Sequence, residues 1–168
     1  VFAVCNLTNS LVSLILMNTL AILSYSFVYI VNLLNKPLEG IIRKRFCNQA
    51  HKKIKDIPNL KVVGITGSYG KTSTKYIVNT ILSQKYNTLM TPESYNTTMG
   101  VVRTIIEHLN STHQLFVCEM GAKYVGDIKE ICDIVEPQYG ILTAIGPQHL
   151  DTFKSIDNVR KTKLELID

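Results

Sequence analysis

The chain has 168 residues, 46% of them hydrophobic, and carries a formal net charge of +5. This length suits one compact domain with an appendage. The basic residues concentrate between Lys36 and Lys61, where eight basic residues face two acidic ones, whereas ten basic and eleven acidic residues follow from Val62 onward. Such a basic stretch can follow a membrane span or bind nucleic acid. Because it has no interleaved aromatic residue beyond Phe46, we expect no nucleic-acid partner.

Residues 1–35 carry no charged side chain, and residues 11–34 consist mainly of Leu, Ile, Val, Phe and Tyr. A helix of about 20 apolar residues spans the bilayer core, so residues 1–35 are predicted to be a transmembrane anchor. A buried core helix is the alternative, although little other chain is left to surround it. A cleaved signal peptide is disfavoured, because the run is too long and lacks a preceding basic region. Since Val1 is not an initiator methionine, we expect the native start, together with any further spans, to lie upstream.

Residues 36–59 are predicted to be a basic connector. Apolar residues recur there at every fourth position, which is typical of an amphipathic helix lying near the membrane or against the next domain. The apolar positions are Leu38, Ile42, Phe46, Ala50 and Ile54. The sequence D-I-P-N at 56–59 should end this helix. Basic residues directly after a span remain in the cytoplasm, so we expect the protein to be membrane-anchored, with everything after Lys36 in the cytoplasm.

Residues 60–168 alternate between short apolar runs and helical patterns, which predicts an α/β fold. The predicted strands are 61–66, 87–90, 114–119 and 139–144, and the predicted helices are 71–84, 98–109, 124–135 and one that begins near 156. Such alternation indicates a mostly parallel, P-loop-type sheet with helices on both faces and ligands at the carboxyl ends of the strands.

A phosphate-binding loop is predicted where the first strand meets its helix, in the sequence T-G-S-Y-G-K-T-S at 66–73. Glycines let successive N–H groups face phosphate oxygens, and the start of the helix adds positive potential. Lys71 should reach the β- and γ-phosphates, and the Thr72 hydroxyl should bind Mg²⁺. Ile65 stands where the strict P-loop pattern has its first glycine, and a glycine-rich turn without a ligand is the alternative. The predicted nucleotide-binding residues are Thr66, Gly67, Ser68, Gly70, Lys71, Thr72 and Ser73.

Three further polar residues are candidates. Glu119 closes an apolar strand, which suits an oxygen ligand of Mg²⁺, although an exposed strand-end carboxylate is the alternative. Asn96 lies where it can contact the γ-phosphate or form an Asx turn before a helix. His149 follows Gly146 and Pro147 in a strand-end loop, where a histidine is usually solvated.

The cysteines show no metal-binding or C-x-x-C spacing, so we expect reduced structural thiols. They are Cys5, Cys47, Cys118 and Cys132.

Five segments together resemble the central, ATP-binding domain of the Mur ligase family, and most closely its MurF type. Besides the loop at 66–73, they are T-P-E-S-Y-N-T-T-M-G at 91–100, C-E-M-G-A at 118–122, T-A-I-G-P-Q-H-L-D at 143–151 and K-T-K-L-E-L at 161–166. The likeness covers residues 60–168, in the family's order and spacing, with the domain incomplete at its C-terminus.

The resemblance implies ATP and two Mg²⁺ ions as cofactors. It implies that His149 helps to hold the second ion and that Lys163 is carbamylated by CO₂, which turns an ammonium into a metal-binding anion; Lys161 remains the alternative position. The catalytic residues implied are Lys71, Asn96, His149 and Lys163, and the metal ligands are Thr72, Glu119, His149 and Lys163.

The activity implied is ATP-dependent amide-bond formation through an acyl-phosphate, adding D-Ala-D-Ala to a UDP-MurNAc-tripeptide in peptidoglycan precursor synthesis. A separate C-terminal ligase domain is missing, so we expect the chain to be inactive alone. Residues 1–59 leave no room for the usual UDP-substrate domain. The alternatives are a MurE-like or folylpolyglutamate-like ligase, a membrane P-loop ATPase, and a tethered nucleotide-binding module that recruits cell-wall enzymes.

Overall fold

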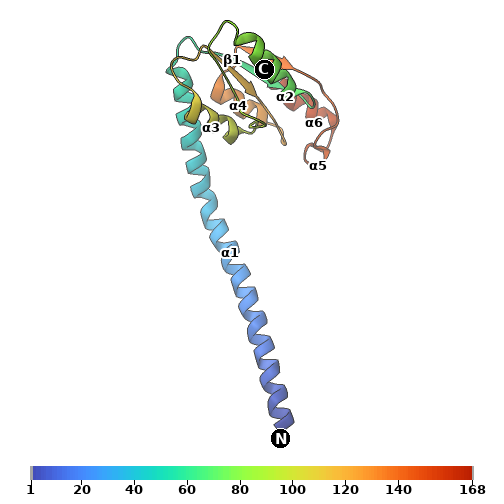
Figure 1. Cartoon of the computed structure of the whole chain (residues 1–168). Helices are drawn as coiled ribbons and strands as arrows, with labels where there is room; N and C mark the ends of the chain where they lie inside the picture. Colours follow the sequence, from blue (N-terminus) through green and yellow to red (C-terminus); the bar gives the residue numbers. More distant parts are fainter. Residues whose placement is uncertain (1, 168) are drawn as a thin grey trace. The chain divides into compact units, whose positions relative to one another are not determined.

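The computed structural model describes residues 2–167, and the side chains of residues 12–167. This part of the chain forms four strands and six helices, and Figure 1 shows the course of the chain. The strands are β1 (Lys61–Thr66), β2 (Thr88–Met90), β3 (Leu115–Glu119) and β4 (Tyr139–Leu142). The helices are α1 (Phe2–Lys55), α2 (Lys71–Leu82), α3 (Thr98–His108), α4 (Asp127–Val135), α5 (Leu150–Phe153) and α6 (Ile156–Leu164). Every predicted strand and helix of residues 60–168 is present, and only the four-residue α5 was not predicted.

Helix α1 is continuous and runs through Pro37, so the predicted anchor and connector belong to one helix. It ends at Lys55, just before the predicted break. The chain divides into two compact units between Arg43 and Lys44. In the first unit nearly all of the described apolar side chains are exposed, and the helix is long and apolar enough, by length and composition, to cross a membrane.

The end of α1 belongs to the second unit. Ala50 and Ile54, the last two positions of the predicted apolar stripe, are buried in its core, whereas Phe46 is exposed. The connector was predicted to lie either near the membrane or against the next domain. Its C-terminal half packs against that domain.

All four strands are parallel and lie in the order β2-β3-β1-β4. After β1 the chain continues to β2 at one edge of the sheet. After β3 it continues to β4 at the opposite edge. In such sheets the crevice between the two diverging connections, at the carboxyl ends of the strands, is where ligands bind. Ile65 pairs with Glu119 in the register, so the phosphate loop and the acidic strand end emerge side by side.

Helices cover both faces of the sheet, as predicted. On one face Val63, Ile65 and Val117 pack against α2. On the other face the alternate residues, including Val62 and Phe116, pack against α3, α4 and α6. Each fully buried aliphatic side chain contributes about 1.5–3 kcal/mol, so these two cores hold the strand ends in fixed positions.

Candidate active site

The loop between β1 and α2 has the backbone of a phosphate cradle. Gly67 (φ 148°) and Gly70 (φ 76°) both adopt conformations that side chains disfavour, and Gly70 precedes α2 without any side-chain cap. The first N–H groups of a helix have no partner within it and carry a positive potential. The start of α2, at Lys71, Thr72 and Ser73, therefore offers donors suited to phosphate oxygens.

The loop is fastened to the segment that follows β4. The Ser68 amide donates to Ala144 O at 2.7 Å, and the Ser68 hydroxyl donates to Gly146 O at 2.9 Å and accepts from the Gly146 amide at 3.0 Å. The Tyr69 hydroxyl donates to Pro147 O at 2.9 Å. The amide and the hydroxyl of Ser68 are thus both hydrogen-bonded to the segment that follows β4. The sequence motif that contains Gly146 and Pro147 has a role, bracing the phosphate loop, that the sequence did not indicate.

Thr66 also helps to hold the phosphate loop in place. Its buried hydroxyl donates to Met120 O at 3.0 Å, which ties the end of β1 to the turn after β3. The predicted nucleotide-binding residues therefore divide into two groups. Thr66 and Ser68 hold the loop in place, while the start of α2 faces the crevice.

Lys71 lies over the loop, where its Nζ donates to Gly67 O at 2.9 Å. Burial lowers the pKa of Lys71, and the negative charge of Glu119 opposes this change. The two predicted residues of opposite charge are therefore close enough to interact electrostatically.

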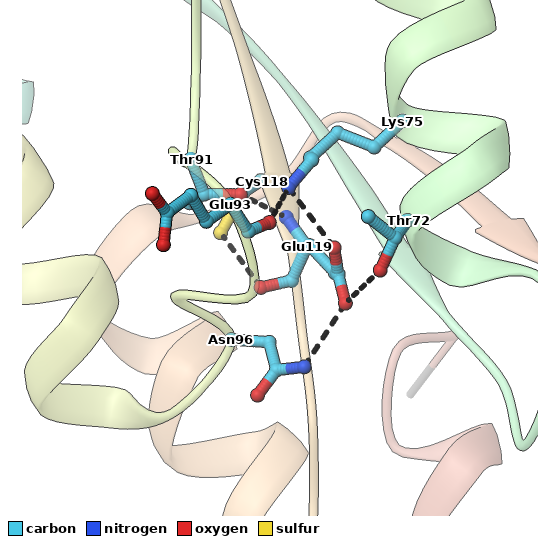
Figure 2. A network of polar contacts seen from close by, with 7 residues as sticks. All are labelled: Thr72, Lys75, Thr91, Glu93, Asn96, Cys118 and Glu119. Carbon is cyan, nitrogen blue, oxygen red and sulfur yellow. Dashed lines mark hydrogen bonds and ion pairs between the residues drawn. The ribbon is translucent and has the colours of Figure 1, made fainter.

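Glu119 is the centre of a polar network at the carboxyl end of β3 (Figure 2). Its side chain is 1% exposed. Oε1 accepts from the Thr72 hydroxyl at 3.1 Å and from Asn96 Nδ2 at 2.9 Å. Lys75 Nζ lies 3.1 Å from Oε2. Three predicted site residues from three different loops and elements, Thr72, Asn96 and Glu119, therefore meet at one carboxylate.

Lys75 is a functional candidate that the sequence analysis missed. Its side chain is fully buried, and besides the ion pair with Glu119 it donates to the backbone oxygen of Glu93. One signal pointed to it. Lys75 follows Lys71 by four residues, and this spacing places both lysines on the same face of α2.

The loop that carries Asn96 is packed closely against the turn after Glu119. The Gly121 amide donates to Asn96 O at 2.6 Å, and a Cβ at Gly121 would lie 2.7 Å from Asn96 Oδ1. Thr97 caps α3 by accepting from the Gly100 amide at 3.3 Å. Thr97 provides the cap of the following helix, while the Asn96 side-chain amide reaches Glu119.

Lys163 on α6 is 1% exposed, whereas Lys161 is exposed. Burial, and to a smaller extent the charge of Lys71, lower the pKa of Lys163 to about 8, although Asp127 and Glu165 oppose the change. Of the two positions considered, Lys163 is thus the one that is enclosed and that shares the electrostatic environment of Lys71.

Two contacts hold the segment with Lys163. The Glu165 carboxylate accepts from the Gly126 amide at 2.8 Å and the Lys129 amide at 3.0 Å, which caps the start of α4. Leu166 packs over Gly64, where a Cβ would lie 2.7 Å from Leu166 Cδ1. The last motif of the sequence is therefore anchored to both α4 and the sheet.

His149 is exposed and stands at the start of α5 in a left-handed conformation (φ 52°). Within residues 12–167, no contact joins its side chain to Glu119, and no group of three or more His, Cys, Asp and Glu side chains lies close enough to hold a metal ion. The structure thus brings Thr72, Asn96 and Glu119 into contact, and within the described residues it records no contact between the His149 side chain and these three.

The donors around Glu119 fit Mg²⁺. Apart from the ion pair with Lys75, Oε2 of the buried Glu119 carboxylate accepts no hydrogen bond from a described residue, so this oxygen keeps lone-pair capacity for a further ligand. Carboxylate and hydroxyl oxygens are hard ligands of the kind that Mg²⁺ prefers.

The thiols near the site are suited to structural roles. Cys118 is buried in β3, and burial raises its pKa well above the usual range; burial also raises the pKa of Cys132 to about 11. A thiol that stays protonated is a poor nucleophile. The Cys5 side chain lies outside the described residues.

Residues 65–168 match the family model described as "Mur ligase middle domain". The chain belongs to the Mur ligase family. Its curated relatives include two UDP-N-acetylmuramoyl-tripeptide--D-alanyl-D-alanine ligases. The ligase of Buchnera aphidicola subsp. Baizongia pistaciae is 37% identical over 113 residues, which are 67% of this chain and 24% of the relative. That of Synechocystis sp. is 34% identical over 108 residues, which are 64% of this chain and 24% of the relative.

Solved Mur ligase structures share the fold. MurF from Acinetobacter baumannii aligns with a TM-score of 0.71 and 34% identity, over 74% of this chain and 27% of that one. The MurF ligase from Thermotoga maritima in complex with ADP gives a TM-score of 0.71 and 33% identity, over 74% of this chain and 29% of that one. The predicted family and the predicted parallel α/β fold are therefore confirmed. The chain spans about a quarter of the length of the curated relatives that it matches.

Proposed function

We propose that this chain supplies the Mg·ATP-binding part of a MurF-type ligase, which joins D-Ala-D-Ala to UDP-MurNAc-tripeptide. The observation that carries the proposal is the meeting of Thr72, Asn96 and Glu119 beside the phosphate loop that bears Lys71. Relatives named for this reaction, at 34–37% identity, support the choice of substrates.

Each part of the site has a task in this proposal. The free N–H groups at the start of α2 and the Lys71 ammonium hold the β- and γ-phosphates of ATP. Thr72 and Glu119 provide oxygen ligands for one Mg²⁺, and His149 and a carbamylated Lys163 are the proposed ligands of a second. Bound Mg²⁺ supplies charge neutralisation at the phosphates and polarises the γ-phosphoryl group.

The reaction proceeds in two steps. A carboxylate oxygen of the UDP-linked peptide attacks the γ-phosphorus of ATP, a new O–P bond forms, and the bond to the bridging oxygen breaks to release ADP. The amine of D-Ala-D-Ala then attacks the acyl carbon, the C–O bond breaks to release phosphate, and the nitrogen loses a proton. In this proposal Lys71 stabilises the charge on the transferred phosphoryl group, and Asn96 orients that group.

Lys163 is proposed to react with CO₂ through its neutral amine to form the carbamate. The site supports this step in two ways. The side chain is 1% exposed, which protects a carbamate from water, and burial lowers its pKa to about 8, so that much of the amine is neutral at a slightly basic pH.

The apolar helix provides a proposed location. We propose that residues 1–35 anchor the ligase in the membrane, that residues 36–59 connect this anchor to the catalytic part at 60–168, and that the catalytic part faces the cytoplasm. The length and hydropathy of the helix and the basic residues after it support this arrangement. Recovery of the protein in the soluble fraction of disrupted cells, without detergent, would contradict it.

The proposed function is tested by Lys71→Ala in the ligase that contains this chain, with Lys85→Ala, an exposed lysine beyond the end of the same helix, as the control. Product formation should depend on ATP, UDP-MurNAc-tripeptide and D-Ala-D-Ala together. It should fall by about a thousandfold or more in Lys71→Ala and remain normal in Lys85→Ala. Near-normal turnover by a folded Lys71→Ala protein would remove the mechanism. ATP hydrolysis that needs no amine would favour a membrane P-loop ATPase instead.

A further inference from the structure

We propose that Lys75 is a positioning residue of this site, which holds the Glu119 carboxylate and the loop bearing Asn96 in register for a metal-bound nucleotide. Both members of the Lys75–Glu119 pair are almost completely buried, with exposed side-chain fractions of 0% and 1%. The inference rests on the function proposed above, because it concerns how the same site takes Mg·ATP.

Lys75 contacts one oxygen of the Glu119 carboxylate, and Thr72 and Asn96 contact the other. Its Nζ lies 3.1 Å from Oε2, while Oε1 faces Thr72 and Asn96. A carboxylate can rotate about its last bond, and a cation fixed on one oxygen removes that freedom. The ion pair therefore sets the direction in which Glu119 presents its oxygen lone pairs to the start of α2.

The same ammonium also fixes the loop that follows β2. Lys75 donates to the backbone oxygen of Glu93, three residues before Asn96, and the Glu93 side chain itself points away from the network (Figure 2). One buried cation on α2 thus connects the strand that ends in Glu119 with the loop that carries Asn96. No other described lysine is fully buried at this crevice except Lys163, which lies on α6.

The burial of the pair explains why the role needs a lysine. A buried carboxylate that loses its cationic partner is strongly disfavoured, and the surrounding structure shifts to relieve the charge. A methionine at position 75 has nearly the same length and keeps the packing, but it cannot hold Glu119 Oε2 or Glu93 O. The expected defect is therefore specific to Mg²⁺-dependent binding.

The test is ATP titration of the full chain, purified in detergent, once with Mg²⁺ and once with EDTA. The ratio of the two affinities measures the gain from Mg²⁺. Wild type and Lys85→Met, an exposed lysine just after α2, should show the full gain. In Lys75→Met the ratio of the two affinities should be at least about tenfold smaller than in wild type, while the affinity in EDTA stays within about threefold of wild type.

The outcomes separate the two proposals. If wild type itself shows no Mg²⁺-dependent binding, the proposed function fails. If wild type shows the gain and a folded Lys75→Met protein keeps it, the positioning role is wrong. Should Lys75→Met not fold, Lys75→Arg decides, because it keeps a positive charge beside Glu119 but replaces a compact ammonium with a planar fork. A reduced gain in folded Lys75→Arg supports positioning, and a full gain overturns it.

Discussion

The Thr72 hydroxyl lies 3.1 Å from Oε1 of Glu119, which joins the start of α2 to the end of β3. Forty-six residues separate the two side chains in the sequence, and the parallel pairing of β1 with β3 brings them together. A hydroxyl and a carboxylate at this separation form a ready pair of oxygen ligands next to the phosphate loop.

The Thr72–Glu119 contact predicts a selective effect of Thr72→Val, which keeps the shape of the side chain and removes its oxygen. We expect Mg²⁺-dependent ATP affinity to fall by about tenfold and the affinity in EDTA to change little, since only the metal ligand is lost. Calorimetric titration measures both. Thr80→Val, at an exposed position of the same helix, is the matched control, and Thr72→Ser should restore most of the affinity.

Gly67 is predicted to tolerate no side chain. A Cβ there would lie 2.0 Å from Thr143 Oγ1 and 3.0 Å from the Ala144 amide, so Gly67→Ala must displace the loop from the segment that braces it. We expect ATP binding to be lost and the melting temperature to fall. Gly40→Ala is the control, because a Cβ at Gly40 meets nothing within 4 Å. Equal ATP affinity in both variants would show that the loop is not held as described.

Glu165, the residue that follows α6, is predicted to stabilise the fold by capping α4. Glu165→Ala removes two charge-assisted hydrogen bonds, from the Gly126 and Lys129 amides, and should lower the free energy of unfolding by about 1.5–3 kcal/mol. Urea denaturation measures this loss. Glu107→Ala, which breaks an exposed pair with Arg103, should cost less than about 1 kcal/mol. A smaller loss for Glu165→Ala than for Glu107→Ala would contradict the capping role.

Carbamylation of Lys163 is predicted to depend on pH. Because burial lowers its pKa to about 8, the ammonium loses its proton as the pH rises, and the neutral fraction should increase about fivefold between pH 7 and pH 8. With ¹³C-labelled bicarbonate, the carbamate resonance should grow over the same range. Lys163→Met should abolish the signal and Lys161→Met should keep it. The reverse result would assign the modification to Lys161.

Much of this arrangement was predictable from local sequence. Valine and isoleucine runs, the glycines before Lys71 and the spacing of apolar residues predicted the strands, the helices of residues 60–168 and the phosphate loop. The apolar stripe of 36–59 also predicted a helix. The sequence could not show that this helix joins the preceding apolar segment, because Pro37 ordinarily suggests a helix start and yet lies inside α1.

The tertiary contacts were beyond such reasoning. The position of Ser68 in the glycine-rich loop suggested that it binds phosphate. Its hydrogen-bond partner Gly146 lies 78 positions away, and only the folded structure shows that the two are bonded. The spacing from Lys71 placed Lys75 on the same face of α2, but only the structure shows that Lys75 is buried against Glu119. His149 illustrates the opposite case. The family resemblance implied that it is a metal ligand, and the structure leaves its side chain exposed, so that role remains a proposal.

The central claim is that the loop bearing Lys71 and the carboxylate of Glu119 hold one metal-bound nucleotide. The most direct measurement is a crystal structure of the chain with Mn²⁺ and a non-hydrolysable ATP analogue, in which the anomalous signal locates the metal. The account predicts an anomalous peak about 2.0–2.3 Å from a Glu119 oxygen and from the Thr72 hydroxyl, with the β- and γ-phosphates at the start of α2. A nucleotide bound elsewhere, or a metal peak remote from Glu119, would contradict it.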